Sequence, residues 1–423
     1  MSLLQKIAPG RPDVIRRVTK TRRWKFSRVI LLGLFFLAVF GDFIASEKPL
    51  FAKRNGRVSF PVAQQYLVDL GFSKFPAEVY RQGWKDLDYE RVVWPLIPYG
   101  SKTLDRRNTG WVGPFDKQET NGLRDRHWLG TDQLGRDVVA GLISGTRTAL
   151  SVGILAMLIA GILGIFIGGL GGFYGDHGMR MSRVRIVLLV VGILLGVFWA
   201  FISRPFSSQT TLTPGSLLIS LLLFFGVVAI FYIVGKKIGT ISKSNTKVLV
   251  PVDQWVLRSI EIFGSIPALL LLLCLIAVFE KSSILLVGII LGFLFWPTIA
   301  RYMRAEMLKL RERNFLESYK ALGFSSRRIF FRHGLPNGLS PVLITLAFGM
   351  GGAILAEAIL SFIGIGIPLD EVTWGSMLNE ARRNFSAWWI AILPGIMIFL
   401  AVFSLNILGE GLSQLLDPKQ ERF

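Results

Sequence analysis

The chain has 423 residues, of which 52% are hydrophobic, and its mean hydropathy is +0.51. Soluble globular proteins reach an apolar share near half only when glycine is counted. This composition therefore excludes an ordinary soluble protein and predicts an all-α protein with several membrane spans. The formal net charge is +20. Its cations gather at the ends of apolar runs, as the positive-inside rule and lipid headgroups require, so we expect a lipid bilayer and no nucleic acid as a partner.

Residues that bind metals or form disulfides are few in this sequence. Cys274 is the single cysteine, so no intrachain disulfide is possible, and its position in an apolar run predicts a packed thiol. The three histidines at 127, 177 and 333 lie far apart and lack the spacing of metal ligands. We therefore expect no metal and no cofactor bound by the chain.

The N-terminal part predicts a membrane anchor. Residues 1–28 are polar and basic, with one acidic residue, Asp13, so this end should stay in the cytoplasm. The apolar run 29–45 is long enough for one span and longer than the core of a typical signal peptide. We expect a first transmembrane helix over 29–46 that is retained rather than cleaved.

The segment 47–148 should be extracytoplasmic. Its part 47–127 is the only long soluble stretch, and segments of this length are translocated largely regardless of charge. Its spaced aromatic residues suggest a folded cap. The polar residues that follow predict an interfacial helix, held by Asp132, Arg136 and Asp137. No nucleophile with a positioned base occurs there, so we expect no catalysis.

The spans after the cap occupy residues 149–410. The run 149–173 is rich in glycines, which let helices approach closely in lipid. Two further apolar runs, 186–202 and 217–234, have cations at their outer ends, so we expect a helical hairpin with its connector outside. The remaining spans are expected at 262–279, 284–302, 339–363 and 388–408. About eight spans result, with 303–337 and the tail 411–423 in the cytoplasm and both termini inside.

A polar stretch in the cytoplasmic loop predicts two short helices. Asn314 followed by Glu317 has the spacing of a capping box, which predicts a helix start. Apolar residues then fall on one stripe: Phe315, Leu316, Tyr319 and Leu322. Gly323 favours the positive φ at which many helices stop. Because a helix this short is marginal alone in water, its stripe needs a partner surface.

The second short helix should begin at a serine cap, Ser325 or Ser326, and run through residue 332. Gly334 and Pro336 are expected to break it, with Leu335 restricted between them.

One ionisable residue lies within an expected span. Glu357 sits midway along 339–363, where a carboxylate costs a few kcal/mol and is a candidate functional group. It either lines a substrate path or is a buried carboxylate satisfied by a neighbouring helix. No G-x-x-x-x-G-K-[ST] phosphate loop occurs in the chain, so energy from ATP would have to come from a partner.

Glu317, Gly323 and the Leu335-Pro336 pair resemble the EAA loop of membrane permease subunits of ATP-binding-cassette (ABC) importers. Further matches narrow the resemblance to the dipeptide and oligopeptide permease branch: Arg332-His333, Leu335-Pro336-Asn337, the stretch 352–357, Trp374-Gly375 and Leu416-Asp417-Pro418. The resemblance covers 128–174 and 251–418. Ser318 and Tyr319 replace the two alanines of the pattern, and Gly334 replaces an aliphatic residue, so the docking face would suit a particular ATPase.

The resemblance implies a transport subunit of a bacterial inner membrane, without enzymatic activity, that forms the path for peptides or peptide-like solutes. It implies a second homologous permease, two ATP-binding subunits that use ATP, and an extracytoplasmic solute-binding protein, which holds most of the substrate recognition. Contact with that protein is an alternative role for the 132–137 motif. The hairpin within 175–250 would be an insertion in the six-helix core of the family, and the long 47–127 loop weakly resembles permeases of the microcin-uptake type.

Two other classes compete with an importer. An ion-driven secondary transporter would need coupling-ion carboxylates in several spans or halves related by a repeat, whereas the sequence has one mid-span acid. A membrane hydrolase would need a Ser-His or paired-acid constellation in its spans, and we find none.

Overall fold

A computed structural model of the chain describes residues 18–69, 71–76, 79, 83–120, 122–176, 178–203, 214–241, 247–278, 283–365 and 371–416. The expectations for the basic residues 1–17, the connector 204–213, His177 and the tail from 417 onward lie outside the described residues. The chain divides into two compact units. The first comprises residues 1–157, 283–291 and 346–423, and the second comprises 158–282 and 292–345.

The described residues contain seven helices that are long and apolar enough to cross a membrane. They include α3 (Arg22–Ile44), α6 (Val138–Tyr174), α7 (Arg183–Val197), α8 (Pro214–Ile241), α11 (Ile284–Arg311), α14 (Leu335–Ile363) and α16 (Trp388–Leu416). Helix α7 is extended by a π-helical turn, η2 (Phe198–Ile202). The expectation of a polytopic helical membrane protein is thus confirmed.

The structure has an eighth span only if one bent pair of helices crosses the membrane as a unit. Helices α9 (Val252–Ser265) and α10 (Ala268–Val278) meet at an angle of 84°. Pro267 stands at the break, where its ring and its missing N–H prevent a continuous helix. The span expected over 262–279 thus overlaps this bent pair, and its first residues lie in α9 before the bend. Cys274 is exposed on α10, so the expected packing of its thiol within this chain is wrong.

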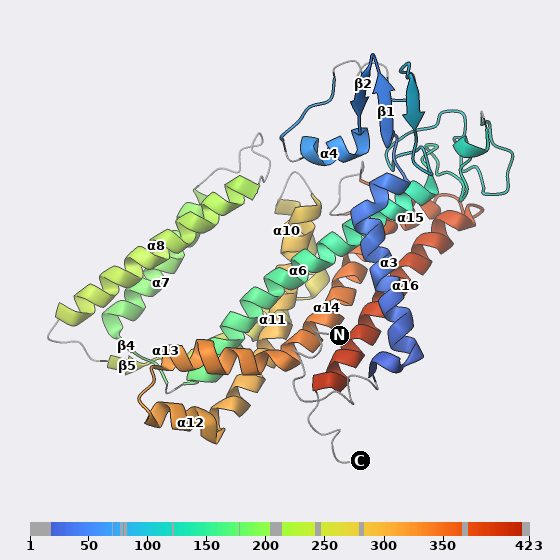
Figure 1. Ribbon diagram of the computed structural model, residues 1–423. Helices are drawn as coiled ribbons and strands as arrows, with labels where there is room; N and C mark the ends of the chain where they lie inside the picture. Colours follow the sequence, from blue (N-terminus) through green and yellow to red (C-terminus); the bar gives the residue numbers. More distant parts are fainter. Residues whose placement is uncertain are drawn as a thin grey trace. The chain divides into compact units, whose positions relative to one another are not determined.

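Helices α7 and α8 form the expected hairpin and lie side by side (Figure 1). Glycines of α7 allow the close approach: a Cβ on Gly192 would lie 2.6 Å from Phe231 Cβ, and one on Gly196 would lie 3.1 Å from the Phe224 ring. The base of the hairpin is a two-stranded antiparallel ribbon of β4 (Arg180–Ser182) and β5 (Lys247–Leu249).

In the second unit, α6 and α11 make the backbone contact that the glycine-rich sequence predicts. A Cβ on Gly168 would lie 2.2 Å from the Ala300 carbonyl oxygen, and one on Gly164 would lie 2.5 Å from Ile299 Cβ. Gly172 similarly meets the backbone of Arg304. Only glycine permits such contact, so this face of α6 fixes where α11 lies.

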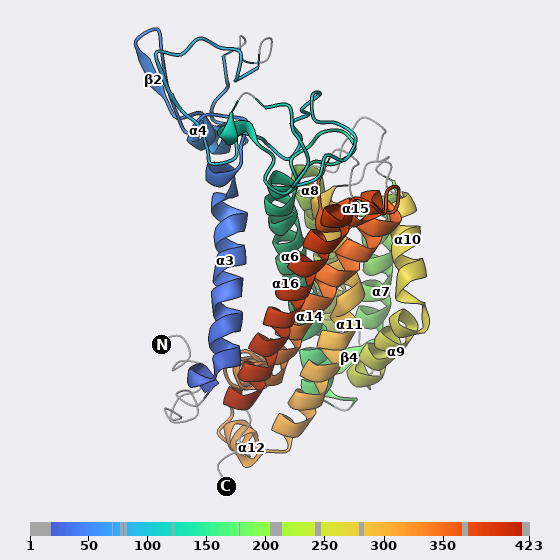
Figure 2. The same cartoon turned by 90° about the vertical axis from the view of Figure 1, so that its right-hand side faces the viewer.

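The cap of the first unit has a three-stranded antiparallel sheet in the order β2-β1-β3. Its elements are β1 (Phe51–Arg54), β2 (Arg57–Ser59), β3 (Arg91–Val93), helix α4 (Pro61–Asp69) and the short turn η1 (Leu123–Asp125). Figure 2 shows α3 leading up to α4 and β2. The Tyr66 hydroxyl of α4 donates to Asp42 of α3 at 2.9 Å, and Arg147 of α6 pairs with the same carboxylate at 2.8 Å. The cap is therefore anchored to two spans by one shared acid.

Candidate functional site

The polar loop begins with helix α12 (Asn314–Ala321), which has the expected bounds and carries Glu317 in its first turn. The helix stops as expected, because Gly323 has φ +77°. A Cβ built on Gly323 has no atom within 4 Å. The requirement for glycine at this position is therefore conformational and not steric.

The apolar stripe of α12 is divided between the protein interior and the surface. The Leu316 side chain is 1% exposed, whereas Leu322 is 73% exposed. The Tyr319 ring stacks on His333, with centroids 4.0 Å apart. The Phe315 side chain lies outside the described part of the chain. Two of the expected docking residues thus hold the loop together, and Leu322 and Glu317 remain on its surface.

The second short helix is continuous with the following span, which corrects the expected break. Helix α13 (Ser326–Ile329) is capped by Ser325, whose side chain accepts from the Arg328 N–H. It continues through a π-helical turn, η3 (Phe330–Gly334), into α14. The Leu335 N–H donates to the Phe330 carbonyl across this wide turn. Pro336 therefore lies inside a continuous helix, directly after the π-helical turn.

Aromatic packing anchors the loop to the second unit. Phe330 is 1% exposed, and its ring lies edge-on to Phe173 of α6 at 5.3 Å between centroids. Nearby, Arg304 of α11 forms a bidentate ion pair with Asp253 of α9, one contact of which measures 2.6 Å. The two residues of this pair are 51 positions apart and no periodic pattern links them, so the sequence alone does not predict their contact.

Glu357 lies in the interior of the first unit with 1% of its surface exposed. Its Oε1 accepts a hydrogen bond from the Ser361 hydroxyl at 2.7 Å, and its Oε2 has no partner among the described residues. Helix α15 (Trp374–Ala381) packs directly on this part of α14, since a Cβ on Gly375 would lie 2.3 Å from the Ala358 carbonyl oxygen. The Trp374-Gly375 pair thus covers the segment that carries the carboxylate.

The motif that precedes α6 is a set of turns, so the expected interfacial helix is wrong. Gly130 and Gly135 have positive φ angles of 80° and 81°, which interrupt any helix. Asp132 accepts from the backbone N–H groups of Leu134 and Arg136 at 2.9 and 2.8 Å and pairs with the Arg136 side chain. Asp137 accepts from the Ala140 N–H at 2.9 Å and caps the start of α6.

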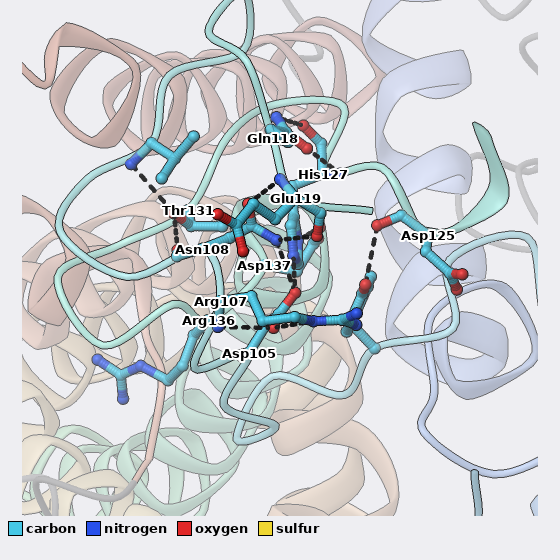
Figure 3. A network of polar contacts seen from close by, with 12 residues as sticks. Asp105, Arg107, Asn108, Gln118, Glu119, Asp125, His127, Thr131, Arg136 and Asp137 are labelled. Carbon is cyan, nitrogen blue, oxygen red and sulfur yellow. Dashed lines mark hydrogen bonds and ion pairs between the residues drawn. The ribbon is translucent and has the colours of Figure 1, made fainter. Parts of the chain in front are cut away.

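His127 is the centre of a buried polar network next to this motif (Figure 3). Its side chain is fully buried, with Nδ1 2.8 Å from Asp137 and Nε2 3.3 Å from Asp105. The Tyr99 ring stacks on it at 4.2 Å. Burial alone would raise the pKa of Asp105, but bonds from Asn108, the Arg107 N–H and His127 hold this pKa below its usual value. Nothing in the sequence pattern links these residues, and sequence reasoning missed the network.

A cavity of about 320 Å³ opens beside the motif in the first unit, and its walls include Asp132, Arg136, Ser361 and Glu380. Glu380 accepts from the Gln133 N–H at 2.8 Å and lies 3.4 Å from Arg136. Burial and the neighbouring Asp132 carboxylate raise the pKa of Glu380. The described residues hold no group of three or more His, Cys, Asp or Glu that could bind a metal ion.

The structure is that of a polytopic helical membrane protein with a polar loop between two of its spans. Residues 238–422 match the family described as binding-protein-dependent transport system inner membrane component. This match covers somewhat less than half of the chain; together with relatives that are ABC transporter permeases, it shows a permease subunit of an ABC importer, a transport subunit without enzymatic activity.

Three relatives illustrate the range of the similarity. The inner membrane ABC transporter permease protein YejE of Escherichia coli is 25% identical over 424 residues, which cover 99% of each chain. The peptidoglycan transport system permease protein YejE of Agrobacterium fabrum is 24% identical and covers 94% of this chain and 90% of its own. The dipeptide transport system permease protein DppC of Alkalihalophilus pseudofirmus is 27% identical over 71% and 74%. These relatives favour an ABC importer over the ion-driven secondary transporter.

Proposed function

We propose that this permease imports short peptides, and in particular peptide-bearing fragments of the cell wall. The observation that carries the proposal is the extent of the similarity. The two relatives named YejE cover at least 94% of this chain, cap included, whereas the dipeptide permease covers 71%. One of the two is named for peptidoglycan transport. Amide-linked peptide chains are common to peptidoglycan and to dipeptides, the substrates for which two of these relatives are named.

In this proposal the loop from α12 to η3 enters a cleft of the ATPase subunit and receives its motion. The exposed Leu322 and Glu317 would meet the ATPase, while the buried Leu316 and the Tyr319–His333 stack keep the loop rigid. Phe330, packed on Phe173, would pass the displacement to α6. Rigid packing supports this role because a loose loop would absorb the motion.

The path for the solute would run past Glu357. Ser361 lines the 320 Å³ cavity and donates to Glu357, so one hydrogen bond separates the buried carboxylate from that cavity. The turn motif with Asp132, Arg136 and Asp137 lies at the same cavity and would face the solute-binding protein. A second homologous permease and two ATP-binding subunits would complete the importer.

The orientation follows from the charges. The cap at 47–127 would lie outside, and the loops 175–185, 236–257 and 303–337 would lie inside, with both termini in the cytoplasm. Single-cysteine labelling in a Cys274→Ser background tests each loop from either side. Labelling of the 236–257 loop only from outside would contradict this topology.

The transport proposal is tested with the full complex in proteoliposomes that contain ATP. We expect uptake of a disaccharide-tripeptide from peptidoglycan and of the free tripeptide in the presence of the binding protein. Vanadate should stop this uptake, while a protonophore should leave it unchanged. Uptake of sugars without a peptide part, at the rate of the tripeptide, would show that the peptide is not what the importer selects.

A further inference from the structure

The charged residues of the α7–α8 hairpin are all of one sign. Between residues 177 and 252 the sequence contains eight Lys or Arg residues and no Asp or Glu. Six of the eight lie within the described part of the chain: Arg180, Arg183, Arg185, Lys236, Lys237 and Lys247. No carboxylate of the hairpin itself can neutralise them.

The structure brings these six residues to one end of the hairpin. Strands β4 and β5 pair Ser182 with Lys247, so the cations of both strands lie on one ribbon. At the first turn of α7, Gly235 of α8 approaches Arg185, because a Cβ on Gly235 would lie 3.1 Å from Arg185 Cα. The Arg185 guanidinium lies over the Tyr232 ring at 4.0 Å. The base of the hairpin is therefore a positively charged surface built by four segments, which we name the basic base (Figure 1).

The rest of the hairpin indicates what covers this surface. In the most apolar 18-residue stretch of each helix, only 17% of the residues are buried in α7 and 11% in α8. The same measure for α11 is 56%. Large apolar side chains such as Leu194, Leu222 and Phe225 are more than 60% exposed. Such faces are compatible with lipid chains, and contact with lipid chains would place the basic base at headgroup level.

We propose that the basic base is a binding surface for anionic phospholipids, which it recognises by their phosphodiester headgroups. Exposed Arg183 and Lys236 come from the two helices and can contact one headgroup region from both sides. Arginine donates in a fixed fork that matches phosphate oxygens, and lysine adds a point charge. The surface distinguishes anionic from zwitterionic lipids, because a zwitterionic headgroup carries its own compensating cation.

The test uses the full-length chain in detergent and measures its melting temperature as phosphatidylglycerol, cardiolipin or phosphatidylcholine is added. We expect both anionic lipids to stabilise the wild-type chain and phosphatidylcholine to have no such effect. A double variant, Arg183→Gln with Lys236→Gln, should need roughly tenfold more anionic lipid for the same shift. The matched control, Arg57→Gln with Lys117→Gln, removes the same charge from exposed cap positions and should behave as the wild type.

The possible results distinguish lipid binding from a general effect of charge and from protein docking. None of them depends on which solute is transported. Equal lipid responses in the double variant and the control would overturn it, since general charge would then explain the effect. Loss of ATPase co-purification in the double variant, with an unchanged lipid response, would also overturn it and identify a protein-docking surface. A stronger response to cardiolipin than to phosphatidylglycerol at equal phosphate would support it and show that two linked phosphates are bound.

Discussion

Tyr319 and His333 stack with their ring centroids 4.0 Å apart and their planes inclined by 21°. This stack joins the short helix α12, which would be unstable in isolation, to the long helix that runs from α13 through η3 into α14. The loop therefore has a defined shape before any ATPase subunit binds it.

Removing the Tyr319 ring should uncouple the permease without unfolding it. Tyr319→Ala eliminates the stack, and aromatic pairs commonly contribute about 0.5 to 1.5 kcal/mol beyond their buried area. We expect normal membrane levels, with at least a fivefold loss of substrate-stimulated ATP hydrolysis in the reconstituted complex. Tyr319→Phe keeps the ring and is the matched control. Equal activity of both variants would show that the stack does not contribute to coupling.

Gly323 should tolerate only residues that accept a left-handed backbone. At φ +77° an L-residue costs about 1 to 2 kcal/mol, and a β-branched side chain costs more. Gly323→Val should therefore lose co-purification of the ATPase, while Gly323→Asn should keep most of it. Since no atom lies within 4 Å of a Cβ there, a steric clash cannot explain a difference between the two. Pull-down of the ATPase by each variant is the measurement.

Glu357 should accept glutamine better than leucine. Glutamine keeps an oxygen that can accept from the Ser361 hydroxyl, whereas leucine leaves the buried hydroxyl without that acceptor, at a cost of about 1 to 3 kcal/mol. We expect transport and melting temperature to fall in the order wild type, Glu357→Gln, Glu357→Leu. Ser361→Ala removes the same bond from the other side and is the control. Identical transport by all four proteins would exclude a role for this carboxylate.

The cap should lose stability in acid through Asp105. The pKa of this carboxyl is lowered in the folded protein, so its stabilising contribution is present above the unfolded value near 4 and disappears as the pH falls through the folded value. Melting temperatures measured between pH 5 and pH 3 should therefore fall further for the wild type than for Asp105→Asn. The opposite order would mean that the network favours the protonated acid.

The sequence predicts those parts of the fold that depend on residues close together in the chain. Apolar runs located the spans, and Gly323 marked the end of α12 because glycine alone accepts that backbone readily. Local rules failed at Pro336, which does not break the helix: the chain passes through a π-helical turn just before it and continues into α14. They also failed for contacts between distant segments. The His127–Asp105 pair and the Asp253–Arg304 pair depend on how the chain folds back, and no periodicity encodes them.

The β4–β5 ribbon means that the inserted hairpin leaves and rejoins the chain at neighbouring points. Ser182 and Lys247 are paired across an antiparallel ladder, where adjacent strands lie roughly 5 Å apart. A two-residue Asn-Gly turn is the ordinary link between strands so paired. The two ends of the hairpin are therefore already adjacent, so a short turn between β4 and β5 could replace α7 and α8 without moving either strand.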